Sequence, residues 1–343
     1  MKWLIYGAYG YTGELITHHA KRMGYSPILA GRNQGKLDTF AEHVKLEARA
    51  FDLSHDALVE NLQDIDLVVH CAGPFSKTAE PMMHACIATG THYLDITGEI
   101  EVFELAHQLH AQAEEAGIVL CPGVGFDVIP TDCIAARLKS QMPGATHLKL
   151  GFDSRSRMSR GTAKTSIEGL GKGGAVRKEG HIVSVPLAYK TEEINFGDGR
   201  KLAMTIPWGD VSTAYYTTGV PNIEVYIPAS PKLVKQLKRL NRVRWLLRRR
   251  FVQTWLSKKA EKQPAGPEAK EREQHATWVW GEISNDQGET ISLREKVLNG
   301  YSLTARGAVE VAIHVLRHQI KPGFYTPSRL YGAKLIDLFL ADK

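Results

Sequence analysis

Three glycines near the N-terminus have a spacing that suits the binding of a dinucleotide. Gly7, Gly10 and Gly13 follow the apolar run 1–6, which we interpret as a buried parallel strand, and precede a helix that ends near Gly24. The first glycine allows a tight turn, the second lets backbone approach phosphates, and the third lets the helix pack closely. The helix N-terminus then faces the anion with free N–H groups and a positive dipole. We expect the pyrophosphate to contact Gly7, Gly10, Tyr11, Thr12 and Gly13.

Arg32 indicates which dinucleotide is bound. Residues 26–31 read as the second strand, and an NAD-binding chain usually carries Asp or Glu at its end, about 20 residues after the turn. Here Arg32 stands at that point, with Asn33 and Lys36 just beyond it. A carboxylate would repel a 2′-phosphate, whereas a guanidinium binds it with two hydrogen bonds. We therefore predict NADP(H), the alternative being a surface arginine in a strand-to-helix turn.

Carboxylates in two later loops are candidates for acid–base chemistry. Asp127 and Asp132 lie five residues apart in a glycine-rich loop, where a carboxylate is able to orient substrate or relay a proton. The alternative for Asp132 is capping of the helix that follows it. Asp95 and Glu99 flank the loop after the predicted fifth strand, and we expect either a supporting role or, for Glu99, the start of a helix.

A polar, glycine-rich segment in the second half of the chain is a candidate anion site. It contains Arg160, Gly161, Thr162 and Ser166, whose side chains suit a carboxylate, a CoA or a carrier phosphate. A plain surface turn is the alternative. The histidines show no metal-ligand spacing; His107 and His110 lack a third ligand, so we predict no metal site.

Strands and helices alternate regularly up to residue 121, which predicts an α/β fold with a doubly wound, Rossmann-type parallel sheet. Ligands of such sheets bind at the carboxyl ends of the strands. The small-residue loop after the fourth strand should line the nicotinamide half of the cofactor, and Asp52, after the third strand, should lie beside the adenine. The loop residues concerned are Ala72, Gly73, Pro74 and Phe75.

The pattern changes after this region to strands with an alternating pattern, which predicts an inserted α+β domain with a mixed or antiparallel sheet. We place the NADP-binding domain at 1–130, completed by C-terminal helices at 300–343. The substrate and dimerisation domain is then 131–299, and we expect a homodimer.

Positive charge is concentrated in residues 231–262, which hold twelve Lys and Arg against the single acid Glu261. The formal charge of +6 belongs to this segment, because the rest of the chain has more acidic than basic residues. Apolar residues recur at steps of three and four, so we predict a basic helix over 232–262. It has three interpretations: a solvated helix that covers the fold, docking on an anionic membrane surface, or nucleic-acid binding, which we discount because no recognition module is present.

Four cysteines without a C-x-x-C pair, no signal peptide and no long apolar run predict a cytoplasmic protein, at most peripheral to a membrane. Short-chain dehydrogenases use a Tyr-x-x-x-Lys pair, and no tyrosine here has Lys four residues later. P-loop, nucleophile-elbow and zinc motifs are also absent.

Several stretches resemble the saccharopine dehydrogenase-like oxidoreductases, and within them the trans-acting enoyl reductases. They are GAYGYTG with AGR, HCAGPF, YLDITGE, GFDVIPTD, SRGTAKTS, VWGE, NGYSLTA and YTPSRLYG, spread over nearly the whole chain. PAGP at 264–267 departs from the expected Glu-Gly-Pro. The loop with Asp127 resembles a segment that faces the substrate cleft in saccharopine-forming reductases. The resemblance implies an NADP(H)-dependent oxidoreductase that transfers hydride to a small molecule, an enoyl group of an acyl or lipid-like substrate. The alternatives are an imine reductase acting on amino acids, with Arg155, Arg157 and Arg160 as carboxylate ligands, and a non-catalytic, membrane-surface-associated NADP-binding protein.

Overall fold

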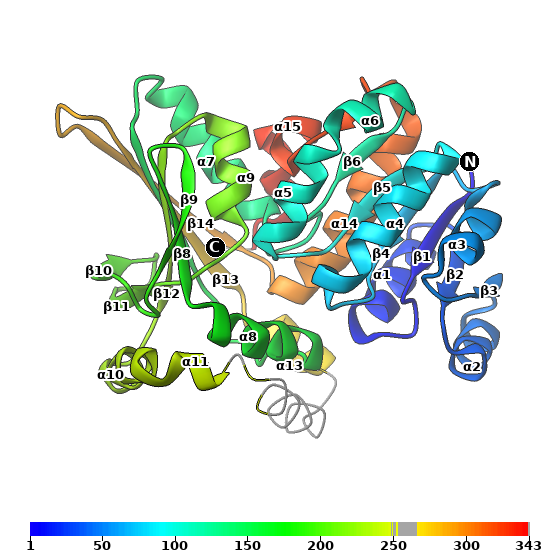
Figure 1. Ribbon diagram of the computed structural model, residues 1–343, viewed down its shortest axis with the longest axis horizontal. Coiled ribbons are helices and arrows are strands. Elements are labelled where there is room, and N and C mark those ends of the chain that lie inside the picture. The colour runs from blue at the N-terminus through cyan, green and yellow to red at the C-terminus, as the bar shows by residue number, and fades with distance from the viewer. Residues whose placement is uncertain (248, 250–251, 253–265, 342–343) are drawn as a thin grey trace. The chain divides into compact units, whose positions relative to one another are not determined.

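The computed structural model describes residues 1–247, 249, 252 and 266–341 and divides into two compact units (Figure 1). The first unit is Met1–Ile129 with Tyr301–Gly332, and the second is Pro130–Gly300 with Ala333–Lys343. The chain from Ala333 onward, which the sequence assigns to the NADP-binding domain, therefore belongs to the second unit. Much of the predicted helix 232–262, and the first half of the motif at 264–267, lie outside the described residues.

The first unit is built on a seven-stranded, fully parallel sheet with the strand order β15-β6-β5-β4-β1-β2-β3. This is the Rossmann order with one strand added at an edge, so the predicted doubly wound α/β sheet is confirmed. The central strands are buried on both faces because each is an almost continuous apolar run. The strands are β1 Trp3–Tyr6, β2 Ile28–Gly31, β3 Ala48–Ala50, β4 Leu67–His70, β5 His92–Asp95, β6 Val119–Cys121 and β15 Gly323–Phe324.

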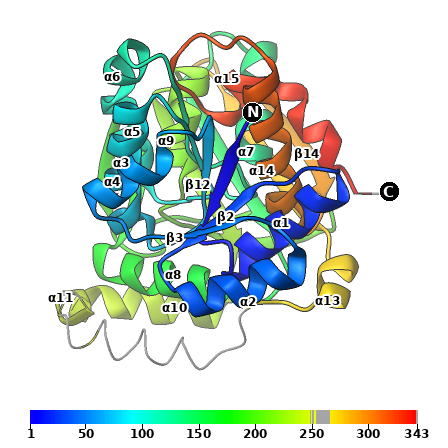
Figure 2. The same cartoon turned by 90° about the vertical axis from the view of Figure 1, so that its right-hand side faces the viewer.

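Helices cover both faces of this sheet. Figures 1 and 2 show α3, α4 and α5 in one layer, with α1 and α14 on the opposite side of the strands. The crossovers reverse direction between β1 and β4, which opens a ligand site at the carboxyl ends of these two strands. The helices are α1 Tyr11–Arg22, α2 Gln34–Val44, α3 His55–Leu62, α4 Phe75–Thr89, α5 Ile100–Gln108, α6 His110–Glu115, α14 Gly300–Arg317 and α15 Pro327–Tyr331.

Three local features depart from a simple alternation of strands and helices in this unit. Helix α4 begins at Phe75, and Pro81 lies within it. The helical region after β5 is divided at Leu109 into α5 and α6. Strand β15 has two residues, too few for any periodic pattern.

The second unit holds a mixed eight-stranded sheet, as predicted. Its main path is β10-β11-β12-β7-β13-β14; β12 and β7 are parallel, and β8 joins β12 to β9. The hairpin β13–β14 pairs in register from Thr277 with Val297 to Ser284 with Thr290. The strands are β7 His147–Asp153, β8 Gly174–Lys178, β9 His181–Val185, β10 Thr191–Asn195, β11 Arg200–Thr205, β12 Asn222–Pro228, β13 Thr277–Ser284 and β14 Thr290–Val297.

Helices pack on this sheet through small or apolar positions. Gly281 of β13 leaves room for Ile134 and Leu138 of α7, since a Cβ there would lie 2.6 Å from Ile134. Helix α9, inside a region predicted mostly as strands, was missed. The described helical elements are α7 Ile129–Gln141, α8 Arg160–Lys172, α9 Asp210–Thr218, α10 Pro231–Leu240, η1 Asn241–Val243, α11 Arg244–Leu247, α13 Ala269–Gln274 and η2 Ala333–Phe339.

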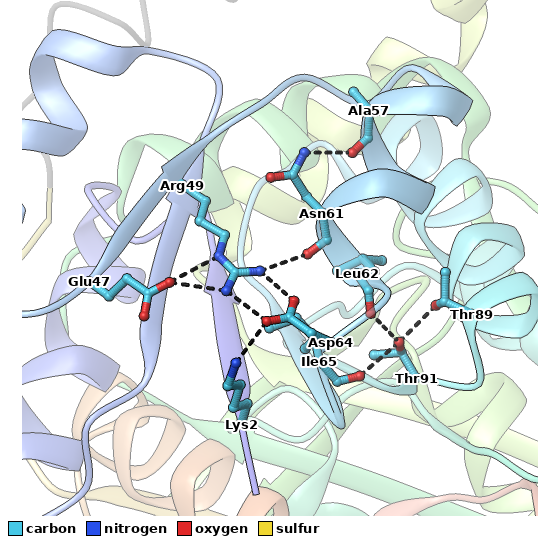
Figure 3. A network of polar contacts seen from close by, with 10 residues as sticks. All are labelled: Lys2, Glu47, Arg49, Ala57, Asn61, Leu62, Asp64, Ile65, Thr89 and Thr91. Atoms are coloured by element: carbon cyan, nitrogen blue, oxygen red, sulfur yellow. Dashed lines mark hydrogen bonds and ion pairs between the residues drawn. The ribbon is translucent and has the colours of Figure 1, made fainter.

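A polar network in the first unit joins Arg49 of β3 to residues that precede the strands β1, β3 and β4 (Figure 3). Arg49 donates to both carboxylate oxygens of Asp64 over 2.6 and 3.0 Å and also contacts Glu47. Lys2 adds a 2.9 Å ion pair to Asp64. The Arg49 hydrogen bond, followed by that of Lys2, holds the pKa of Asp64 well below its usual range. These contacts fasten the amino edge of the sheet, opposite the carboxyl edge where ligands bind.

Candidate cofactor and proton-transfer site

The glycine turn lies at the carboxyl end of β1. Gly7 has a φ of +85°, and its N–H donates to the Ala30 carbonyl oxygen over 2.8 Å. A Cβ at Gly13 would lie 2.3 Å from the Gly7 carbonyl oxygen, so only glycine lets α1 begin this close to the turn. Gly10 precedes α1, and no side chain caps this helix. The helix N-terminus is therefore open to a pyrophosphate, next to Tyr11 and Thr12.

Arg32 stands exposed directly after β2, where a 2′-phosphate would lie. The adjacent Asn33 caps α2, because its side-chain oxygen accepts the Lys36 N–H over 3.0 Å. Tyr9 fixes the start of this turn: its hydroxyl accepts the Asn33 N–H over 3.1 Å, and its ring lies against Gly31. Arg32, the N-terminus of α2 and Lys36 thus come together in one short turn.

Asp52 follows β3 but is engaged by its own turn. Its Oδ1 accepts the Ser54 N–H over 2.9 Å and the Ser54 hydroxyl over 2.6 Å. The hydroxyl bond, followed by the backbone bond, lowers the pKa of Asp52. Its predicted place beside the adenine remains a prediction.

The loop after β4 touches the glycine turn, since a Cβ at Gly7 would lie 2.9 Å from the Ala72 nitrogen. Thr78 and His70 hold this loop in place. The Thr78 hydroxyl donates its hydrogen to the Ala72 carbonyl over 2.7 Å. It therefore accepts its hydrogen bond with His70, so the His70 Nε2–H is the donor, over 3.0 Å. Burial lowers the pKa of His70 to about 3, which keeps the ring neutral. The fixed loop presents Ala72 and the exposed Gly73, with Pro74 beside them, at the strand ends.

Phe75 is the first residue of α4 and lies partly buried, with its ring edge-on to His70 at 5.5 Å. Phe75 therefore packs against His70, which supports the loop after β4, and also borders that loop. Glu99 holds the same helix end: its two oxygens accept the N–H groups of Phe75 over 3.0 Å and Ser76 over 2.8 Å. Glu99 also directly precedes α5, so it has both the supporting role and the helix-start position expected as alternatives from sequence.

Asp95 joins the loops after β5 and β6. Its buried carboxylate accepts hydrogen bonds from the Tyr93 hydroxyl and from the N–H groups of Thr97 and Gly123, over 2.7 to 2.9 Å. Burial raises the pKa of Asp95 to about 6, although these hydrogen bonds act in the opposite direction. Because Thr97 and Gly123 belong to different loops, Asp95 holds the two loops in position.

Asp127 lies in the loop after β6 with its carboxylate against Gly98; a Cβ at Gly98 would lie 2.9 Å from Oδ2. Gly98 directly precedes Glu99. Burial, followed by the negative charge of Glu99, raises the pKa of Asp127 from 3.8 to about 7. Thr304 of α14 anchors the loop, because its hydroxyl oxygen accepts the Phe126 N–H over 3.0 Å. Asp127 is thus a partly exposed carboxyl group that retains a proton near neutral pH.

The other predicted site residues lie in the second unit. Asp132 is fully buried in the first turn of α7, and its carboxylate accepts the Thr217 hydroxyl of α9. Arg160 is the exposed first residue of α8, whose N-cap Ser159 accepts the Thr162 N–H over 3.2 Å. Arg155 and Arg157 are ion-paired with Asp198 and Glu271. Within the described residues there is no metal-binding group of three ligands, and no helix long and apolar enough to cross a membrane.

The strand order, the glycine turn and the arginine after β2 define the first unit as a Rossmann-type dinucleotide-binding domain. The turn fits a dinucleotide, because Gly7 and Gly13 let the loop after β4 and the start of α1 approach it closely, and no side chain caps α1. Residues 3–121 match the family model of the saccharopine dehydrogenase NADP binding domain. This match confirms the predicted NADP(H) as the cofactor.

Parts of the chain are similar in sequence to several known proteins. A saccharopine dehydrogenase-like oxidoreductase of Rattus norvegicus is 30% identical over 202 residues, 51% of this chain and 47% of that protein. A lipid droplet localized protein of Caenorhabditis elegans is 29% identical over 203 residues, with the same coverage. A Mycobacterium tuberculosis protein that carries the name of a trans-acting enoyl reductase is 33% identical over 138 residues, 38% of this chain and 33% of that one.

These matches span about half the length of the first curated relatives. The structure of an apo saccharopine dehydrogenase (L-Glu forming) from Saccharomyces cerevisiae has a TM-score of 0.64 at 13% identity, over 100% of this chain and 99% of that one. At this identity the likeness concerns the fold alone. The predicted resemblance to saccharopine dehydrogenase-like oxidoreductases is thus confirmed.

Sequence reasoning missed the residues that position the site. His70 and Thr78 hold the β4–α4 loop, and Thr304 anchors the loop of Asp127. The histidine at the end of an apolar strand could have indicated the role of His70 and Thr78. No sequence pattern indicates the role of Thr304, because it lies far along the chain from its partner Phe126. All four cysteines are free thiols, as predicted, while cytoplasmic location and homodimer remain predictions.

Proposed function

We propose that the chain is an NADPH-dependent reductase that delivers hydride to the enoyl C=C of an acyl or lipid-like substrate, with Asp127 as the proton donor. The supporting observation is the position of the Asp127 carboxyl group, which lies against Gly98, next to the Glu99 that holds the loop after β4, and whose pKa burial raises to about 7. When bound, the cofactor supplies the hydride; reduction of a C=C bond then needs one proton on the neighbouring carbon.

Different residues of the first unit bind the cofactor and donate the proton. The glycine turn holds the pyrophosphate of the cofactor and Arg32 its 2′-phosphate, and the loop after β4 borders the reactive ring. Asp127 gives its proton to the carbon next to the one that receives hydride. Glu99 fixes the end of α4 and, through its charge, favours the protonated form of Asp127.

We propose a structural role for Asp132, since its carboxylate is buried and bonded to Thr217. The imine-reductase alternative requires arginines that converge on substrate carboxylates. Because Arg155 and Arg157 are paired with acids, that reading loses two of its three candidate ligands. The enoyl substrate is favoured by the motifs of the chain and by the name of its M. tuberculosis relative.

NADPH oxidation across a panel of enoyl thioesters, cyclic imines and ketones tests the proposal. We expect turnover with an enoyl thioester and loss of it in Asp127→Asn, with NADPH binding retained. Asp56→Asn, an exposed carboxylate at the start of α3, is the matched control and should keep full activity. Turnover of imines alone would contradict the enoyl substrate and favour the imine-reductase alternative. Tight NADPH binding without any turnover would favour a non-catalytic binding protein.

A further inference from the structure

A basic pocket lies in the second unit, which contains none of the residues assigned to cofactor binding. It is a cavity of about 350 Å³ between one side of α10 and the strands β10 and β11. Four cations, spaced three or four residues apart and hence on one side of the helix, form its wall. The lining residues are Thr191, Leu202, Pro231, Val234, Lys235, Lys238, Arg239 and Arg242.

Among the described residues these cations have no acidic partner, since none of Lys235, Lys238, Arg239 and Arg242 forms an ion pair with a described carboxylate. Glu192 of β10 and Glu224 of β12 are paired with Lys149 and Lys190, and Glu193 of β10 does not line the pocket. Four like charges around one cavity repel each other, and an anion relieves this repulsion. Both guanidinium groups are able to bind a phosphate with two hydrogen bonds.

The wall is rigidly attached to the fold, so the charges are held in place. Ser230 caps α10 by accepting the Leu233 N–H over 3.2 Å, and Val234 packs into an apolar cluster with Ala188 and Met204. At the other end, the Asn241 side chain accepts the Leu187 N–H over 2.9 Å and donates to its carbonyl over 3.1 Å. The helix therefore does not depend on a ligand for its position.

Apolar side chains are exposed on the same segment. Trp245 is 59% exposed, Val243 41% and Leu233 39%, whereas Val234 of α10 is buried and Leu237 and Leu240 are partly buried. A cationic helix with exposed Trp, Val and Leu matches the composition of helices that lie in a membrane interface, where apolar groups enter the headgroup region and cations bind lipid phosphates. A soluble phosphate compound would leave these apolar groups in water.

We propose that this pocket binds the phosphate of an anionic phospholipid, and that Leu233 to Trp245 attach the second unit to a membrane surface. Each basic residue near such a surface strengthens binding by roughly fivefold, and added salt weakens it. The proposal is independent of the reductase activity, because none of its residues belongs to the cofactor site.

Flotation of the full chain with vesicles tests this proposal. We expect binding to phosphatidylcholine vesicles that contain phosphatidylserine, and none to phosphatidylcholine alone. The double variant Lys238→Gln, Arg242→Gln should bind at least tenfold more weakly. The matched control Lys270→Gln, Lys334→Gln removes two exposed charges elsewhere in the unit and should bind like the wild type. Retained NADPH binding and an unchanged thermal unfolding curve show that both units of each variant are folded.

Should the first variant lose NADPH binding, Lys235→Gln with Arg239→Gln repeats the test at the same wall. Trp245→Ser should also weaken vesicle binding while leaving its salt dependence unchanged. Three results would overturn the proposal: equal binding to both kinds of vesicle, equal loss in the pocket and control variants, or binding of inorganic phosphate, inositol hexakisphosphate or RNA without any binding to vesicles.

Discussion

Replacing Asp127 with Asn should make the protein more stable and much less active at the same time. The partly buried carboxyl group has a pKa raised from 3.8 to about 7, first by burial and then by the charge of Glu99. Above that pH the folded chain holds an unfavourable charge, and an amide of the same size removes it. A residue kept for stability alone would show the opposite result.

The magnitude follows from the pKa shift. Below about pH 4 the group is protonated in both states and contributes nothing. Between about pH 4 and pH 7 only the unfolded chain ionises, so wild-type stability falls as pH rises, by about 1.4 kcal/mol per unit. The upper limit is therefore about 4 kcal/mol; since water reaches this partly exposed group, we expect about 2 kcal/mol.

Urea unfolding at about pH 5 and about pH 8 measures this effect, with Asp56→Asn as the control. The stability gain of Asp127→Asn over the wild type should be below about 1 kcal/mol at the lower pH and should reach about 2 kcal/mol at the higher one. In parallel, kcat should fall by about 100- to 10,000-fold, the usual contribution of a general acid. A variant that is less stable than the wild type at both pH values would refute the reasoning.

Four further predictions follow from the same structure. Wild-type kcat should fall above about pH 7 as the general acid loses its proton, and Glu99→Gln should move this fall to lower pH in a pH–rate profile; an unmoved profile would count against the charge effect. Arg32→Glu should weaken NADPH binding by about 100-fold, with NADH binding retained or improved, as measured by titration. Gly13→Ala should abolish NADPH binding and lower the Tm, because its Cβ would meet backbone at 2.3 Å. Arg49→Met should cost about 1 kcal/mol near neutral pH, and less in acid, because the depressed pKa of Asp64 gives stability that is lost as pH falls.

The cofactor half of the site was predictable from sequence because its requirements are local. A positive φ at Gly7 and the close approach at Gly13 allow no other residue, and these positions lie within one short turn. Arg32 follows its strand at a spacing that the fold fixes. The parallel sheet was equally readable, since its strands are continuous apolar runs.

The proton-transfer half was not predictable in the same way. Asp127 and Asp132 looked equivalent in sequence, yet burial and the nearby Glu99 distinguish the first, while the second bonds to Thr217. Glu99 reaches the N-terminus of α4 across two strand ends, and Thr304 comes from a distant helix. Such contacts depend on tertiary packing, which no local pattern records.

Isotope tracing tests the central claim most directly. With NADPH carrying deuterium at the transferred position and an enoyl thioester as substrate, mass spectrometry of the product should find one deuterium at the carbon remote from the thioester. In deuterated water with ordinary NADPH, the label should instead appear on the neighbouring carbon, and Asp127→Asn should slow both incorporations. A product without cofactor-derived deuterium, or unimpaired turnover in the variant, would contradict the account.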